Sequence, residues 1–321
     1  MKFRWAILLS VLLLSGSWGF FAHPKINRLA VFTLPAQMSI FYKKNIRYIE
    51  EAAVNPDRRR YILPDEAPRH YIDLEEYGDS AVYKLPRYWK QAVEKFGEDS
   101  LQAHGILPWA IQLFYLRLKD ALAIRDPEKI LKYSADLGHY VADAHVPLHT
   151  TKNYDGQLTG QTGLHAFWES RLPELFYSDY NFYTGKAQYI SNVSAEVWKT
   201  IAQTNQALDS VLRFEKLLSE KTGNNKFNFE TKGKQTIKVF SYDYAKAYHD
   251  LLQGMVERQM RRSIWLTGSL WYSAWVDAGQ PDLKMLINYK PSDEELKARV
   301  VELKKWKEER TKIFRDTLHA Y

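Results

Sequence analysis

Apolar residues recur at helical spacing along most of this chain. Over residues 107–124 they stand three or four positions apart, which predicts an amphipathic helix. Asp126 and Pro127 then match the cap and the first position of the next helix, which should run to about His145. The same reasoning predicts helices over three further segments, the last of which opens with a capping box: 195–220, 242–278 and 292–314.

Turn-forming residues separate these helical segments. The Asn55-Pro56-Asp57 sequence predicts a turn, and the proline-containing stretch 58–77 predicts a loop. The polar stretch 151–163 predicts a glycine-rich loop, and residues 221–238 predict a surface excursion.

Composition and pattern together predict an all-α protein. The chain has 321 residues, of which 45% are hydrophobic, enough for one large core. No strand alternation, internal repeat or linker stands out. We expect a single multi-helix domain over residues 18–285, followed by a charged C-terminal helical tail over residues 286–321. Cysteine is absent, which excludes disulfides and lipoprotein attachment.

The first seventeen residues have the features of a secretory signal. Lys2 and Arg4 give a basic start, and the apolar run that follows is too short to span a bilayer. Ser15 and Ser17 suit the positions before a cleavage site, so the mature chain would begin at Trp18. An uncleaved anchor, or a cut a few residues away, is the alternative. We expect an exported protein, periplasmic or secreted, with no stable membrane span after processing.

The charge of the chain is mildly basic. Loss of the two basic signal residues lowers the formal net charge from +7 to +5. This charge suits an anionic substrate or a phospholipid surface without selecting either one.

A cluster of metal-ligand residue types lies near the middle of the chain. His139 and Asp143 are four residues apart, so a helix places both on one face, and His149 follows soon after. Imidazoles and carboxylates are ligands that zinc takes, and the two oxygens of Asp143 suit a bridge between two ions. His165 and Glu169 repeat the four-residue spacing nearby.

Residues upstream extend this cluster. The amine and carbonyl of an N-terminal Trp18 would chelate a cation, and His23 follows five residues later. His70 offers an imidazole in the predicted 58–77 loop. On chemistry alone, three carboxylates compete to join it: Asp57, Asp65 and Asp73.

From residue 18 to about residue 175 the chain resembles the superfamily of zinc-dependent phospholipases C and single-strand nucleases, and residues 242–283 show a weaker similarity to it. The resemblance rests on an ordered set: Trp18-x4-His23, Asp57, His70, His139-x3-Asp143-x5-His149 and His165-x3-Glu169. It implies that Asp57 is the carboxylate, because Asp-x-x-Arg matches a family element. It also implies three zinc ions, held by Trp18, His23 and Asp143; by Asp57, His70, His139 and Asp143; and by His149, His165 and Glu169.

The resemblance implies a phosphodiester hydrolase in which a metal-bound hydroxide attacks phosphorus. Asp143 would act as the bridge and Asp57 as a proton acceptor, so both are candidate catalytic residues. Glu169, rather than aspartate, and the short loop before His165 favour a phospholipase C-like enzyme with a phospholipid substrate. A single-strand nuclease or 3′-nucleotidase is one alternative. A non-catalytic exported zinc-binding protein is the alternative from another class. The sequence identifies no protein partner.

Two residues depart from the family pattern. Gly163 stands two residues before His165, where nucleases commonly carry asparagine. His145 lies inside the core motif at a position that is usually not histidine. We interpret it as a solvated helix-end residue; a hydrogen-bond donor to a metal ligand, or a substrate contact, is the alternative. We likewise interpret residues 58–60, three consecutive arginines, as a solvated face rather than a phosphate clamp.

Overall fold

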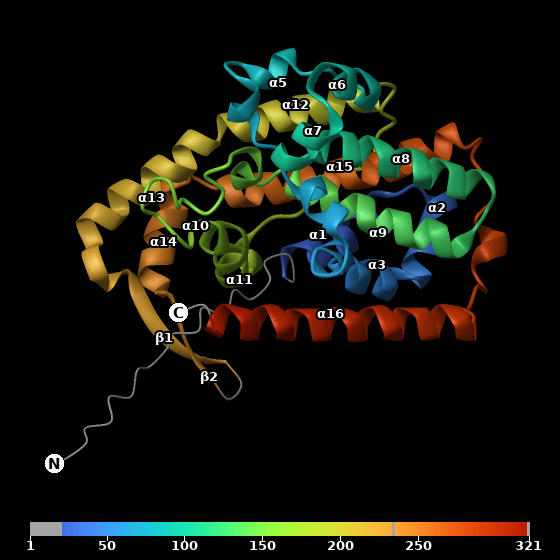
Figure 1. The fold of residues 1–321 in the computed structure, drawn as a ribbon. Coiled ribbons are helices and arrows are strands. Elements are labelled where there is room, and N and C mark those ends of the chain that lie inside the picture. Colours follow the sequence, from blue (N-terminus) through green and yellow to red (C-terminus); the bar gives the residue numbers. More distant parts are fainter. Residues whose placement is uncertain (1–20, 233–234, 320–321) are drawn as a thin grey trace.

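Four helices pack together at the centre of the fold: α1 (Ala22–Ala30), α8 (Leu107–Ala123), α9 (Pro127–Asp143) and α15 (Met255–Asp277). The computed structural model describes residues 21–232 and 235–319, so the predicted signal segment and Trp18 lie outside the described residues. Figure 1 shows α8, α9 and α15 running across the middle of the molecule. Helices make up most of the described chain, which confirms the predicted all-α class.

The helix that carries the central motif forms as its sequence predicts. The Asp126 side chain accepts a hydrogen bond from the Lys129 backbone nitrogen at 3.0 Å, which caps the first turn of α9. The helix ends at Asp143, two residues before the predicted end. Its apolar face packs into the main core, where the fully buried Trp271 ring of α15 stacks on Tyr42 at 5.2 Å.

Short helices connect α1 to α8. In chain order they are η2 (Val31–Thr33), α2 (Ala36–Lys44), α3 (Ile46–Ala52), α4 (Asn55–Arg59), η3 (Pro64–His70), η4 (Leu74–Tyr77), α5 (Ala81–Lys84), α6 (Trp89–Phe96) and α7 (Glu98–His104). Here η2, η3 and η4 are 3-10 helices. The predicted turn at residues 55–57 is wrong, because these residues form the start of α4. The predicted 58–77 loop contains η3 and η4.

The second half of the chain is broken into more helices than predicted. Between α9 and α15 it forms η5 (Pro147–Thr150), α10 (Leu164–Ala166), the π-helical turn η6 (Phe167–Arg171), α11 (Leu172–Phe176), η7 (Tyr177–Asp179), α12 (Val193–Gln206), α13 (Leu208–Thr222), η8 (Gly223–Lys226) and α14 (Tyr242–Leu251). The predicted 195–220 helix is therefore two helices. The predicted 242–278 helix breaks at Gln253 and Gly254, whose φ angles are positive at 49° and 73°.

A β-hairpin interrupts the helical pattern where we predicted only a surface excursion. Strands β1 (Phe227–Lys232) and β2 (Gln235–Phe240) pair antiparallel, with Phe227 opposite Phe240. The Phe240 ring stacks on Phe167 of η6 at 4.0 Å. The base of the hairpin is therefore packed onto a second hydrophobic core, which includes Phe167, Tyr244 and Tyr248 and lies beside the turn that carries Glu169.

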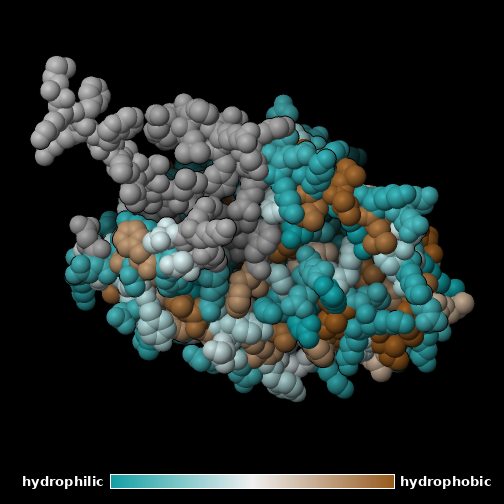
Figure 2. Space-filling view, turned by 90° about the horizontal axis from the view of Figure 1, so that it is seen from below, coloured by the Kyte–Doolittle hydropathy of each residue, from teal (hydrophilic) through white to brown (hydrophobic). Residues whose placement is uncertain are grey.

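After η9 (Lys284–Leu286), the chain ends in the long helix α16 (Asp293–His319), which lies along the bottom of the view in Figure 1. The predicted capping box is present, because the Glu295 backbone nitrogen donates to Ser292 Oγ at 3.2 Å. Trp306 is buried and lies 5.3 Å from the Arg58 guanidinium of α4. The face seen from below is largely hydrophilic with scattered apolar residues (Figure 2). Within residues 21–232 and 235–319, none of the helices has the length and apolar character needed to cross a bilayer.

Candidate metal centre

Eight of the nine predicted ligands meet at one place, although seven separate elements carry them. They come from α1, α4, η3, α9, η5, α10 and η6: His23, Asp57, His70, His139, Asp143, His149, His165 and Glu169. All except His165 are buried. The ninth residue, Trp18, lies outside the described residues.

Asp143 lies at the middle of this centre. Its Oδ2 atom is 2.9 Å from His70 Nδ1 and 3.3 Å from His139 Nε2. Its Oδ1 atom is 3.4 Å from His23 Nε2. Asp57 approaches the same place, with Oδ1 3.8 Å from His70 Nδ1 and 3.9 Å from His139 Nε2. The two oxygens of Asp143 therefore face different donor groups, the arrangement that a bridging carboxylate requires.

A second group forms around Glu169. The Nε2 atoms of His149 and His165 are 2.9 Å apart, and Glu169 Oε2 lies 3.3 Å from the first and 3.2 Å from the second. His165 and Glu169 stand four residues apart across α10 and the π-helical turn η6, and this spacing of about one turn places both side chains on the same face. The other oxygen, Oε1, is 3.2 Å from His23 Nε2, so Glu169 joins the two groups.

Backbone carbonyl groups fix the orientation of two imidazoles. His139 Nδ1 donates to the Ala53 oxygen at 2.8 Å, and His149 Nδ1 donates to the His70 oxygen at 2.5 Å. In a neutral imidazole, a protonated Nδ1 leaves the lone pair on Nε2. The lone pairs of His139 and His149 therefore point into the centre, as metal ligands require.

The spacing of the donor atoms fits a metal ion. Within each group, the donor atoms all lie within 4.8 Å of one another. Ligand atoms at about 2.0–2.1 Å from a tetrahedral ion stand roughly 3.3 Å from one another, which is close to several of the separations described above. A cation between such donor atoms would relieve the repulsion between their lone pairs. One Asp57 oxygen, Oδ2, is buried without a hydrogen-bond partner among the described residues. These groups could therefore bind metal ions.

The electrostatics of the centre also favour cations. Burial by itself would raise the pKa of Asp143, yet the charges of His139 and His149 hold it well below its ordinary value. Burial by itself would lower the pKa of His139, but Asp143 and Asp57 raise it to about 9. Three buried carboxylates face the centre, Asp57, Asp143 and Glu169, and without a metal ion the protons on His139 and His149 help to balance their charge. A bound cation can take over this role when it replaces those protons.

A cavity of about 450 Å³ opens beside the metal-ligand groups. Four predicted ligands reach its wall: Asp57, His70, His149 and His165. The wall also contains basic and aromatic residues that sequence reasoning did not select as a set: Arg60, Tyr61, Tyr71, Lys152 and Tyr154. The Tyr154 ring lies 5.9 Å from the His165 ring. Tyr154 is the only aromatic residue in the polar sequence 151–163, and this isolated ring is the feature from which its place in the cavity wall could have been predicted.

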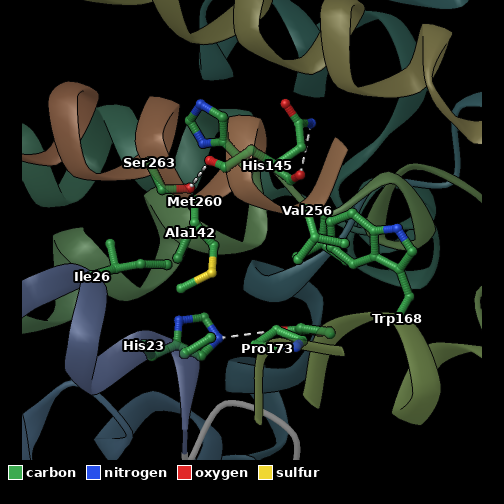
Figure 3. A pocket seen from close by; sticks show the side chains of 13 residues that line it. His23, Ile26, Ala142, His145, Trp168, Pro173, Val256, Met260 and Ser263 are labelled. Carbon is green, nitrogen blue, oxygen red and sulfur yellow. Dashed lines mark hydrogen bonds and ion pairs between the residues drawn. The ribbon is translucent and has the colours of Figure 1, made fainter. Parts of the chain in front are cut away.

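His145 occupies the far wall of a small pocket behind the centre. Figure 3 shows His23 and His145 on opposite sides of this pocket, with Met260 between them. His145 is buried, and its Nδ1 donates to the Val141 oxygen at 2.7 Å. Burial lowers its pKa to about 4. The predicted solvated helix-end histidine is therefore wrong, because His145 is a buried and neutral packing residue.

The predicted solvated face at residues 58–60 is wrong for Arg59. Its side chain is 11% exposed, and its Nη2 lies 3.0 Å from Asp136 Oδ2. Its Nε donates to Glu66 Oε2 at 3.2 Å. Glu66 was not selected from the sequence, because one glutamate in a loop carries no signal of burial. Arg60 is about half exposed and borders the cavity, 3.6 Å from Asp57.

The chain was compared with known proteins. No family model matches it, and a search of curated proteins found no match.

Proposed function

We propose that this protein is an exported, zinc-dependent phosphodiester hydrolase of the phospholipase C type. The observation that carries the proposal is the convergence of eight residues, distant in sequence, into adjoining buried groups beside one cavity. The donor set is histidine and carboxylate without cysteine, which suits zinc among the common divalent ions. With Trp18 added, the ordered set matches the ligands that the family resemblance implies.

The residues of the centre suit this chemistry. Bound divalent ions supply Lewis acidity, lowering the pKa of water and offsetting charge on a phosphoryl group. Asp57 lines the cavity with one buried oxygen that lacks a hydrogen-bond partner, which suits a proton acceptor. Arg60 adds a positive charge to the cavity wall beside the ligand groups, where it can contact an anionic substrate.

A phospholipid substrate is the first choice. Glu169 in place of aspartate and the short loop between His149 and His165 favour it. A single-strand nuclease remains the second candidate, because three tyrosines line the cavity and aromatic rings stack on bases of any sequence: Tyr61, Tyr71 and Tyr154.

The test uses the mature protein, beginning at Trp18 and loaded with zinc. It is assayed against phosphatidylcholine vesicles, single-stranded DNA and a generic phosphodiester, each with and without a chelator. Release of the phosphorylated head group, abolished by the chelator, supports the proposal. Cleavage of DNA without cleavage of lipid replaces the phospholipase by the nuclease. Full zinc content with no turnover of any substrate favours a non-catalytic zinc-binding protein.

A further inference from the structure

A buried glutamate lies directly behind one of the candidate ligands. Glu66 of η3 is 1% exposed, although it carries a carboxylate. Arg69 donates to its Oε2 at 2.9 Å and Arg59 donates to the same oxygen at 3.2 Å. The Tyr140 hydroxyl donates to the other oxygen, Oε1. Two arginines therefore balance the charge of Glu66, and its position is fixed from three sides.

The oxygen held by Tyr140 faces His70. The Nδ1 atom of His70 points into the metal centre, 2.9 Å from Asp143 Oδ2 and 3.0 Å from His139 Nε2. The opposite ring nitrogen, Nε2, is buried and has no hydrogen-bond partner among the described residues. It lies 3.9 Å from Glu66 Oε1.

His70 thus differs from His139 and His149, and it shares with His23, whose Nδ1 atom is also buried without a partner, an outer nitrogen that makes no hydrogen bond among the described residues. His139 and His149 each donate their outer nitrogen to a backbone carbonyl. A metal-bound histidine almost always donates its other N–H to a carboxylate or a carbonyl, which fixes the tautomer and makes the ring a stronger ligand. For His70, the buried Glu66 carboxylate is the acceptor that the structure supplies.

We propose that Glu66 is the positioning residue of His70: with a cation on Nδ1, the Nε2–H group of His70 donates to Glu66 Oε1. This inference rests on the metal centre of the proposed function and adds a residue outside its ligand set. A shift of the imidazole by about 1 Å closes the gap to hydrogen-bond distance. Arg59 and Arg69 keep Glu66 ionised, and Arg59 also binds Asp136 of α9, the helix that carries His139 and Asp143.

The test compares zinc affinity in two variants that disturb the same buried network. Glu66→Gln keeps the shape of the side chain. Its oxygen will face the two arginines, which places the amide NH₂ opposite the Nε2–H group of His70. Zinc affinity should then fall by about 10- to 100-fold. Asp136→Asn removes a charge beside the same Arg59 but does not reach His70, so its zinc affinity should stay near that of the wild type. Affinity is measured by competition with a chromogenic chelator, and stability by unfolding of the metal-free proteins.

The outcomes separate this inference from the proposed function. A wild-type chain that does not bind zinc overturns both. If the wild type binds zinc and Glu66→Gln binds equally well, or if Asp136→Asn loses as much affinity, the positioning role is wrong. A spectrum of the zinc-loaded wild type tests the hydrogen bond between His70 and Glu66 directly, even if the variants do not fold. Nitrogen-15 NMR should show a protected Nε2–H on His70, whereas a rapidly exchanging proton there contradicts the proposal.

Discussion

The Nδ1 atom of His149 donates a hydrogen bond to the backbone oxygen of His70 at 2.5 Å, and the Ile72 nitrogen donates back to the His149 oxygen at 2.9 Å. Two candidate ligands that are 79 residues apart are therefore joined directly by a side-chain-to-backbone bond, and a backbone bond from Ile72 supports the same contact. This pairing fixes the lone pair of His149 toward the centre and holds η3 against η5. The relative position of these two candidate ligands is thus built into the fold.

Replacement of Asp143 should disable the whole centre. Asp143 contacts His23, His70 and His139, so Asp143→Asn removes a charge that these three residues share. We expect zinc content to fall and turnover to drop by roughly 10²-fold or more. The measurements are metal content by mass spectrometry and initial rate at saturating substrate. Asp120→Asn, on the exposed side of α8, is the control. Near-normal rates in Asp143→Asn would refute the bridging role.

The N-terminal amine should be needed for one metal ion only. The mature chain is expected to bind close to three zinc ions, and retention of Ser17 before Trp18 blocks the amine chelate. That extended chain should lose about one zinc and keep the ion at His149, His165 and Glu169. Metal analysis of the two chains, prepared in parallel, measures this. A mature chain with one zinc contradicts the three-metal centre, and equal content in both chains contradicts the chelate.

Without metal, the chain should be most stable near pH 6.5. His139 and His149 have pKa values raised to about 9, since Asp143 outweighs the opposing effect of burial. Their contribution to stability is complete below the unfolded pKa of about 6.5 and is lost as pH rises toward 9. Burial lowers the pKa of His70 and His145 to about 4. These two residues destabilise the fold as pH falls from about 6.5 to 4, because only the unfolded chain takes up their protons.

Zinc should change how the stability of the fold depends on pH above about 6.5. Binding requires neutral imidazoles, so saturating zinc stabilises the fold more as the pH rises above 6.5. Melting temperature is measured from pH 5 to pH 9 with a chelator and with excess zinc. The two curves should diverge toward pH 9. Parallel curves would indicate that the histidines do not bind the metal.

Part of the candidate ligand set could be predicted from local spacing, and the order of the remaining residues was predicted from the family resemblance. His139 and Asp143 need only one helix, and the Asp126 cap and Pro127 mark where it begins. The hairpin and the buried state of Arg59 could not be predicted in this way. Both depend on contacts between distant segments: Phe240 with Phe167, and Arg59 with Asp136. Local polarity suggested solvent exposure, but tertiary packing and ion pairing decided the outcome.

A close helix contact holds His23 in the centre. Gly138 precedes His139 in α9, and a Cβ atom placed there would lie 2.0 Å from Asn27 Oδ1 of α1. Asn27 is buried and donates to the Ala135 oxygen at 3.0 Å. Gly138→Ala should therefore destabilise the fold by about 1–3 kcal/mol and weaken zinc binding, because α1 carries His23. Chemical denaturation and metal content provide the measurements.

The contact itself can be tested by a second substitution. Asn27→Ala removes the atoms that the new methyl group would strike, so the double variant should be less destabilised than the sum of the single variants. Strict additivity would show that Gly138 is needed for another reason.

Tyr154 should distinguish the two substrate classes. It is 52% exposed, lines the cavity and lies beside His165, so its ring is available to a bound substrate. If the substrate is single-stranded DNA, Tyr154→Ala should raise KM about tenfold or more, since base stacking contributes about 1–3 kcal/mol. Tyr154→Phe keeps the ring and should behave as the wild type. For a phospholipid that enters through its head group, both variants should keep a similar KM. Zinc content, measured in parallel, should not change in either variant, because Tyr154 lies on the cavity wall outside the ligand groups. A loss of zinc would instead mean that the ring supports His165, and the KM comparison would then no longer report on the substrate.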